Sequence, residues 1–169
     1  TESTQVRATE LIRIAIQALS ERVQQLFQQL GVFIEDADIP VSTITNLWQL
    51  DQEDVEEILY QLNQQSLLSL TDGYVRIHDL VRNFLQTNLT DETQLHSRLL
   101  DAWKDLYSLP NEYAWRYYIY HAVNAGRTDQ AKELLQDVRW LQAKLDATDV
   151  DALLADYALF PDDTELWRF

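Results

Sequence analysis

Residues 66–85, SLLSLTDGYVRIHDLVRNFL, decide the fold of the first half of the chain. Two short apolar runs, 67–70 and 74–77, flank Asp72-Gly73, and an Asp-Gly pair between such runs is typical of a β-hairpin. Apolar residues at helical spacing follow the second run: Leu80, Phe84 and Leu85. We therefore expect a hairpin that leads directly into a helix ending near residue 89, with His78-Asp79 at the junction.

The segments before the hairpin contain one clear helix and one ambiguous stretch. Residues 1–9 are expected to form a polar lead-in. Residues 11–19 fit both the alternation of a strand and the spacing of a helix, so their secondary structure stays open. Ser20 is expected to cap a helix that ends at Gly31. The predicted inward face of this helix is Val23, Leu26, Phe27 and Leu30.

Two more helices are predicted between residue 32 and the hairpin. Residues 32–34 form a short strand-like piece, residues 41–50 a second helix, and Asp51 caps a third. The predicted inward residues of these two helices are Ile44, Leu47, Trp48, Val55, Ile58, Leu59 and Leu62. Three to four helices followed by a hairpin wing is the plan of a winged-helix domain, which we place at residues 1–90.

The charge of the chain argues against nucleic acid and anionic membrane as partners. The 169 residues include 28 Asp and Glu but only 13 Lys and Arg, for a formal charge of −15. No Lys or Arg occurs between residues 23 and 74, so the predicted third helix lacks the cations that a DNA-reading helix needs. A hydrophobic content of 46% is nevertheless enough for one ordinary domain or two small ones.

The composition also restricts the cellular compartment and the chemistry. There are no cysteines, which excludes disulfides, thiolate metal sites and cysteine nucleophiles. No apolar run approaches about 18 residues and no signal peptide is visible, so we interpret the chain as cytoplasmic. The chain has no Met, even at its first position, and is therefore expected to be a fragment of a longer protein.

From residue 91 onward the pattern is purely helical, and we place a second, antiparallel helical domain at residues 91–169. A first helix carries one apolar stripe, which ends before Pro110: Leu95, Leu99, Trp103 and Leu106. A second helix over residues 113–125 ends at Gly126. Its aromatic residues are interpreted as core rather than as an interaction surface: Tyr113, Trp115, Tyr117, Tyr118 and Tyr120.

Two further helical segments are predicted towards the end of the chain. Thr128 or Asp129 caps the first, which continues past Trp140 after a kink. Thr148 and Asp151 have the spacing of a capping box and are expected to begin the last helix. Its predicted inward face is Val150, Leu153, Leu154 and Tyr157.

The sequence shows no catalytic or metal-binding motif, so we expect no enzyme activity from this chain by itself. The three glycines, Gly31, Gly73 and Gly126, each fit a turn or a cap, and no phosphate-binding loop is present. The three histidines are far apart in sequence and lack metal-ligand spacing: His78, His96 and His121. At the hairpin end, chemistry alone favours a structural interpretation, with Asp79 as the helix N-cap and His78 as a strand-end residue.

Segments in both halves resemble the NB-ARC family of nucleotide-switched (STAND) signalling ATPases, over about residues 10–160. In the first half they are 32–40 (VFIEDADIP), Leu47-Trp48, 55–59 (VEEIL), 66–68 (SLL) and 77–80 (IHDL). In the second half they are Leu95-His96, 120–122 (YHA), 125–127 (AGR), 133–135 (ELL) and 140–145 (WLQAKL). The second set is similar to the helical domain of the apoptotic protease-activating factor family and of bacterial WD-repeat proteins of that type.

This resemblance implies a mechanism and a set of partners. Ile77-His78-Asp79 matches the Met-His-Asp motif of the family, with Ile in place of Met. The resemblance implies that His78 donates a hydrogen bond to the β-phosphate of ADP, bound by an upstream nucleotide-binding domain of the same chain. The helical domain would connect this switch to a C-terminal sensor such as a WD-repeat propeller. Exchange of ADP for ATP would then allow homo-oligomerisation of the parent protein, although the fragment alone holds no cofactor.

Two alternative functions remain open from the sequence. The first is a protein-interaction scaffold that has the fold without the nucleotide switch. The second is a transcription regulator that uses the winged helix on DNA, which the acidic third helix disfavours.

Overall fold

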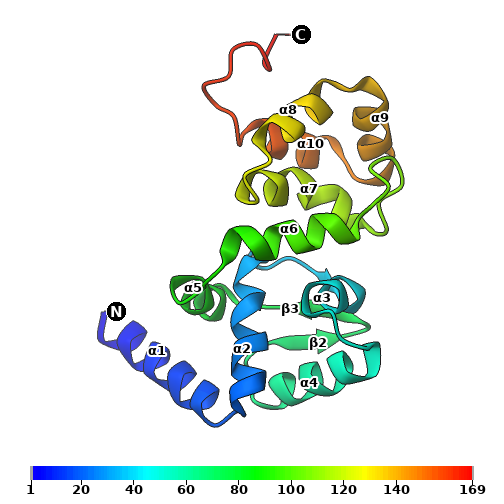
Figure 1. Cartoon of the computed structure of the whole chain (residues 1–169). Coiled ribbons are helices and arrows are strands. Elements are labelled where there is room, and N and C mark those ends of the chain that lie inside the picture. The colour runs from blue at the N-terminus through cyan, green and yellow to red at the C-terminus, as the bar shows by residue number, and fades with distance from the viewer. Residues whose placement is uncertain (1, 169) are drawn as a thin grey trace. The chain divides into compact units, whose positions relative to one another are not determined.

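A computed structural model of the chain describes residues 2–168 and is mainly helical, with one small antiparallel sheet (Figure 1). The contacts within it divide the chain into two compact units, Thr1–Asp91 and Glu92–Phe169. None of the helices in the described part is long and apolar enough to cross a membrane.

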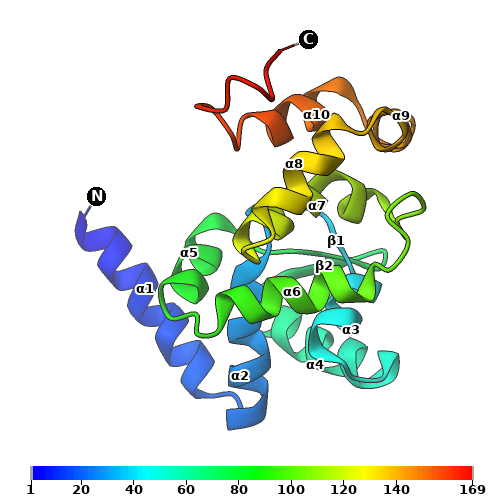
Figure 2. The ribbon, with the colours of Figure 1, turned by 45° about the horizontal axis from the view of Figure 1, so that its top comes forward.

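The first unit begins with helix α1 (Glu2–Gln17), so the prediction of a lead-in over residues 1–9 was wrong. The ambiguous stretch of residues 11–19 belongs to the same helix as far as Gln17. A lone strand there would need a neighbouring strand for its backbone hydrogen bonds, whereas a helix satisfies its own. None of the α1 side chains is buried, and the helix contacts α5 while its N-terminal end points away from the rest of the unit (Figures 1 and 2).

Helix α2 (Glu21–Gln29) is capped as predicted, because the Ser20 side chain accepts a hydrogen bond from the Val23 N–H at 3.3 Å. The helix then tightens into one turn of 3₁₀ helix, Leu30–Val32, and does not stop at Gly31. The predicted strand-like piece at residues 32–34 was therefore wrong. Phe27, Leu30 and Phe33 are fully buried, so these apolar residues serve the core without belonging to a sheet.

Gly31 is explained by close packing and not by a turn. A Cβ atom at this position would lie 3.0 Å from the backbone N of Gln86 and 3.1 Å from the backbone C of Leu85, both in helix α5 (Asp79–Thr87). Backbone atoms cannot rotate away as a side chain can, so any side chain here must push the helix.

We expect Gly31→Ala to lower the free energy of unfolding by about 1–3 kcal/mol, the usual cost of overpacking. Chemical denaturation followed by circular dichroism would measure it. Gln25→Ala, an exposed change in the preceding helix α2, is the control and should have little effect. An alanine variant as stable as the original chain would mean that α5 can move aside without cost.

Helices α3 (Val41–Trp48) and α4 (Gln52–Gln64) follow the predicted pattern. Their predicted inward residues are all buried: Ile44, Leu47, Trp48, Val55, Ile58, Leu59 and Leu62. Asp51 occupies the N-cap position of α4, but its side chain makes no capping hydrogen bond. The backbone between the two helices turns through Gln49, which has a left-handed φ of 54°.

The hairpin is confirmed as strands β2 (Ser69–Thr71) and β3 (Tyr74–Arg76), which pair antiparallel with Leu70 opposite Val75. Asp72 and Gly73 both have positive φ, 52° and 80°, as a two-residue type I′ turn requires. An unpredicted third strand, β1 (Ile39–Pro40), pairs with β3 on its other side and gives the order β1-β3-β2. Helix α5 follows and buries Val81 and Leu85, while Leu80 and Phe84 are half-buried.

The second unit is a cluster of helices, with α7 in contact with each of the others. The helices are α6 (Glu92–Ala102), α7 (Glu112–Asn124), α8 (Thr128–Gln136), α9 (Val138–Ala147) and α10 (Val150–Tyr157). Figures 1 and 2 show α6 on one side of α7 and α8 to α10 on the other. Helix α6 is shorter than its apolar stripe predicted, although Trp103, just beyond its end, is still buried.

The predicted end of α7 is confirmed, but two predicted N-caps in this unit were wrong. Gly126 follows α7 with a φ of 75°, and Arg127 N donates to the Ala122 carbonyl at 2.8 Å. The cap position of α8 is held by Arg127 in place of Thr128 or Asp129.

The capping box predicted for the last helix was also wrong. Asp149 caps α10 by accepting from Ala152 N at 2.8 Å, which leaves Thr148 outside the helix. The predicted kink near Trp140 is a break at Asp137, whose carboxylate caps α9.

The aromatic residues of α7 form core, as predicted: Tyr113, Trp115 and Tyr118 are buried, and Tyr117 and Tyr120 are half-buried. The predicted inward face of α10 was partly wrong. Val150 and Leu154 are 61% and 52% exposed, whereas the buried residues of this helix are Ala152, Asp156 and Tyr157.

Candidate functional site

His78, the one predicted ligand-binding residue, lies exposed where β3 leads into α5. The preceding Ile77 is only 1% exposed, so alternation along the extended backbone turns one side chain into the core and the next outward. His78 occupies the N-cap position, and its carbonyl accepts from Arg82 N at 2.9 Å.

Asp79 was predicted to be the N-cap but is the first residue of α5. The backbone of His78 is extended (φ −64°, ψ 147°) and already supplies the first helical acceptor, so the cap lies one residue earlier. The Asp79 carboxylate accepts from Leu80 N at 2.7 Å, a favourable place for a negative charge at a helix start. The His78 side chain makes no capping hydrogen bond and is exposed.

The other two histidines, which sequence spacing kept apart, are in direct contact in the second unit. His96 of α6 and His121 of α7 are fully buried, and their Nδ1 atoms lie 2.7 Å apart. The Tyr113 hydroxyl lies 3.0 Å from His121 Nε2, and a Glu92 carboxylate oxygen lies 3.6 Å from His96 Nε2. Burial, with a smaller contribution from a charge on His96, holds the pKa of His121 well below its usual range.

Acid is expected to destabilise this unit through His121. Its pKa is lower in the folded than in the unfolded state, so the unfolded state binds the extra proton. The contribution of neutral His121 to the free energy of unfolding is fully present above about pH 6.5. It is lost as the pH falls below that value, by at most about 1.4 kcal/mol per pH unit. The free energy of unfolding is measured for the original chain and for His121→Phe at pH 7.5 and at pH 5.5. The difference in favour of the original chain should be about 1 kcal/mol smaller at pH 5.5.

The comparison with a variant is needed because other buried groups also titrate. Val138→Phe is the matched control, since Val138 lies in the same unit, is 77% exposed and carries no titratable group, so its difference from the original chain should not change with pH. An advantage over His121→Phe that is the same at both pH values would contradict the assignment.

A second polar group in the second unit joins α7, α9 and α10. The Lys144 ammonium of α9 forms a buried ion pair with the Asp156 carboxylate of α10 and donates to the Arg116 carbonyl of α7 at 3.2 Å. Burial raises the pKa of Asp156 to about 7, and burial also lowers the pKa of Lys144. Sequence reasoning gave neither residue a structural role, although Lys144 lies within the segment 140–145 and follows the inward Trp140 by one helical turn.

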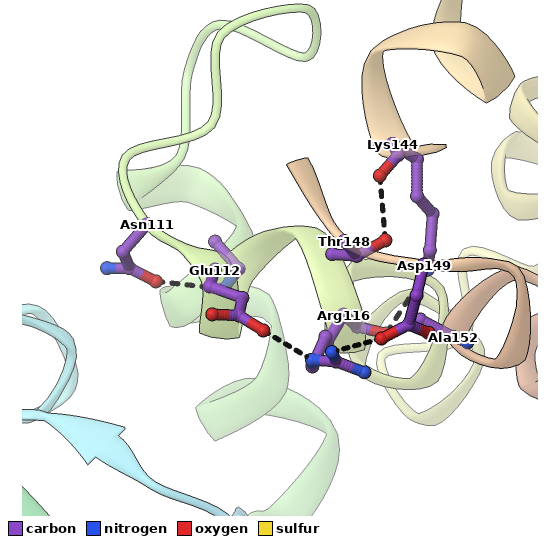
Figure 3. A network of polar contacts seen from close by, with 8 residues as sticks. Asn111, Glu112, Arg116, Lys144, Thr148, Asp149 and Ala152 are labelled. Atoms are coloured by element: carbon purple, nitrogen blue, oxygen red, sulfur yellow. Dashed lines mark hydrogen bonds and ion pairs between the residues drawn. The ribbon is translucent and has the colours of Figure 1, made fainter. Parts of the chain in front are cut away.

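The surface side of this group is a chain of charged contacts, drawn in Figure 3. The Arg116 guanidinium donates to Glu112 at 2.8 Å and to Asp149 at 2.5 Å. These hydrogen bonds raise the pKa of Arg116, and the bond from Arg116 lowers that of Asp149. Thr148 donates to the Lys144 carbonyl at 2.7 Å, so the same segment caps the end of α9 and the start of α10.

The contacts of these groups join helices of the second unit to one another. Among residues 2–168, His, Asp and Glu side chains do not gather in a group of three or more that could hold a metal ion. The exposed His78 is therefore the candidate site, on a unit whose core holds the preceding residue in place.

Comparison with known proteins identifies relatives of both units. Residues 92–162 match the family described as the APAF-1 helical domain. The chain is 27% identical over 157 residues to apoptotic protease-activating factor 1 of Danio rerio, which covers 85% of this chain and 12% of that protein. The proteins of the same name from Mus musculus and Homo sapiens are each 23% identical, over 89% and 80% of this chain.

The chain spans only 12–13% of the length of these relatives. The similarity nevertheless covers more of the chain than the second unit alone, so it includes part of the first unit. The matches confirm the predicted resemblance to the helical domain of the NB-ARC signalling ATPases.

Proposed function

We propose that this chain is a non-catalytic regulatory module of a nucleotide-switched, apoptosome-type signalling ATPase, because residues 92–162 match the APAF-1 helical domain. One observation carries the proposal: a unit with an exposed histidine at its hairpin end immediately precedes the matched helical domain. This is the order that the resemblance of the two sequence blocks requires.

The first unit is proposed to be a winged-helix domain. Helices α2, α3 and α4 precede the hairpin β2–β3, which is the element order of that fold. All four acidic residues near the start of α4 are exposed: Glu53, Asp54, Glu56 and Glu57. They would repel a phosphate backbone, so this domain is not proposed to bind DNA, and a salt-sensitive shift of duplex DNA would contradict that.

The switch is proposed to operate through His78. In the parent protein an upstream nucleotide-binding domain would hold ADP, and the His78 imidazole would donate a hydrogen bond to its β-phosphate. The buried Ile77 supports this role because it fixes the backbone from which His78 projects. A hydrogen bond to a charged group contributes about 1.5–3 kcal/mol, which biases a two-state equilibrium about tenfold or more.

The second unit is proposed to be the connection between this switch and a C-terminal sensor, such as a WD-repeat propeller. Exchange of ADP for ATP would release the His78 contact and allow the parent protein to oligomerise. The chemistry of hydrolysis would belong to the upstream domain, since no residue of this chain supplies a phosphate-binding loop.

The test is the amount of ADP that co-purifies with the parent protein, together with its size by light scattering. We expect His78→Leu to retain about tenfold less ADP or to form larger assemblies, because the inactive state loses its phosphate contact. Tyr74→Leu is the matched control, an exposed aromatic residue on the same hairpin that the mechanism does not use.

Three outcomes would contradict the proposal. A folded His78→Leu protein with unchanged ADP content and size would show that His78 is structural. The same loss of ADP in Tyr74→Leu would show a general disturbance of the hairpin. A parent protein without a nucleotide-binding motif upstream would favour the scaffold function instead.

A further inference from the structure

Helix α10 buries a face that its apolar residues alone do not favour. At about 100° per residue, Val150, Leu153, Leu154 and Tyr157 make one stripe. The structure exposes Val150 and Leu154, half-buries Leu153, and buries Ala152, Asp156 and Tyr157. The buried face is therefore rotated by about a quarter turn from the apolar stripe.

The residue at the centre of the buried face is the charged Asp156, and its partner is the Lys144 ammonium. Lys144 and Asp156 are 0% and 2% exposed. The Lys144 ammonium also donates to the Arg116 carbonyl, so the two charges connect three helices. If α10 turned its apolar stripe inward, Asp156 would move away and leave Lys144 buried without its carboxylate.

The other groups around the pair do not replace this contact. The charged groups near Lys144 are Arg116, Asp149 and Asp156, and the Trp140 ring centroid lies 5.4 Å from the ammonium nitrogen. Asp149 bonds to Arg116 and to the start of α10, while Lys144 is the charged group that faces Asp156. Buried ion pairs add little net stability, because desolvation offsets most of the attraction, but they strongly penalise arrangements that separate them.

We propose that the Lys144–Asp156 pair sets the rotational position of α10 on α7 and α9, against the preference of the apolar residues of α10. The pair acts as a specificity device: it excludes the alternative packing of a short helix of eight residues. Without the pair, the apolar stripe of α10 sets the rotational position of the helix, and Val150 and Leu154 turn inward.

The absence of cysteine from the sequence permits a direct test in the whole chain. A single cysteine is placed at Leu154, which is 52% exposed, or at Ala152, which is 6% exposed. Its rate of reaction with a thiol reagent then reports which face of α10 is accessible. In the otherwise unchanged chain we expect Leu154→Cys to react at least about tenfold faster than Ala152→Cys.

The same two cysteines are then measured after replacing the pair with apolar residues, Lys144→Met with Asp156→Leu. If the pair sets the position of α10, the rate ratio falls to about one or inverts, while circular dichroism shows the same helix content. A folded protein that keeps the ratio of the parent would overturn the proposal.

Two further variants keep the test decisive. Arg127→Met with Asp101→Leu removes an exposed ion pair of the same unit and should leave the ratio unchanged; if it lowers the ratio equally, the effect is not specific to the buried pair. Should the apolar double variant fail to fold, Asp156→Asn removes the charge at nearly constant volume. A ratio unchanged in this variant would overturn the proposal, and a lowered ratio would support it.

Discussion

Replacing Asp156 with alanine is expected to lower the free energy of unfolding by about 3–5 kcal/mol, the usual cost of removing one partner of a buried ion pair. The reason is the fully buried Lys144, whose ammonium would lose the Asp156 carboxylate and keep the Arg116 carbonyl as an acceptor. Denaturant unfolding monitored by circular dichroism at 222 nm would measure the loss.

Two controls separate burial from charge in this experiment. Asp101→Ala breaks the exposed ion pair with Arg127 and should cost no more than about 1 kcal/mol. Replacing both buried partners, Lys144→Met with Asp156→Leu, should cost much less than Asp156→Ala, because no unpaired charge remains. A double variant as unstable as the single one would show that the pair itself contributes the stability.

The pair also predicts a pH dependence with the opposite sign to that of His121. Burial raises the pKa of Asp156 to about 7, so the folded state holds its proton more tightly than the unfolded state. The contribution of protonated Asp156 to the free energy of unfolding is fully present below the unfolded pKa near 3.8. It is lost as the pH rises towards and through 7. Asp156→Asn should remove this dependence, while the dependence due to His121 remains.

Replacing Trp48 with alanine is expected to destabilise the chain by about 3–5 kcal/mol, by leaving a cavity in the first unit. The Trp48 ring is only 4% exposed, and its indole N–H donates to the Leu26 carbonyl of α2 at 2.9 Å. The side chain therefore joins α3 to α2 both by packing and by a hydrogen bond. Urea unfolding followed by circular dichroism would measure the effect without relying on tryptophan fluorescence.

Trp48→Phe divides this effect into its two parts. Phenylalanine keeps most of the buried ring but cannot donate to Leu26, so the variant should lose the hydrogen bond, about 0.5–1.5 kcal/mol, and a small packing contribution. Tyr60→Ala, an exposed aromatic residue on α4, should change little. A Trp48→Ala protein within about 1 kcal/mol of the original would show that the surrounding core collapses into the space.

The features that could be predicted from the sequence are those that neighbouring residues determine. Asp72-Gly73 allows the positive φ angles of its turn whatever surrounds it, and the hairpin formed as expected. Ser20 caps α2 through a bond to a residue only three positions away. The predicted inward stripe of α4 is confirmed, because this helix has a single apolar face to bury.

The features that could not be predicted depend on residues far apart in the chain. Strand β1 needs β3 as a partner, and nothing within Ile39-Pro40 indicates one. His96 meets His121 only because α6 packs on α7. The buried face of α10 follows from Lys144, twelve residues earlier, so its own apolar pattern was misleading.

The candidate site divides in the same way. The position of His78 at the end of the hairpin follows from local sequence, and its exposure agrees with the alternation of buried and exposed residues along β3. Its cap position, one residue earlier than predicted, depends on which carbonyl first accepts a helical N–H. The proposed role towards nucleotide rests on neither observation, because it requires an upstream nucleotide-binding domain of the parent protein.

The packing of Gly31 against α5 has a mechanical consequence for His78. Helix α5 has nine residues and is about 13 Å long. His78 lies at its start, and Leu85 and Gln86 pack against Gly31 near its end. Between them, the Arg82 side chain donates to the Phe33 carbonyl at 3.1 Å. Because α5 contacts Gly31 and Phe33 in this way, we expect a displacement of its start at His78 to be transmitted to the segment that follows α2.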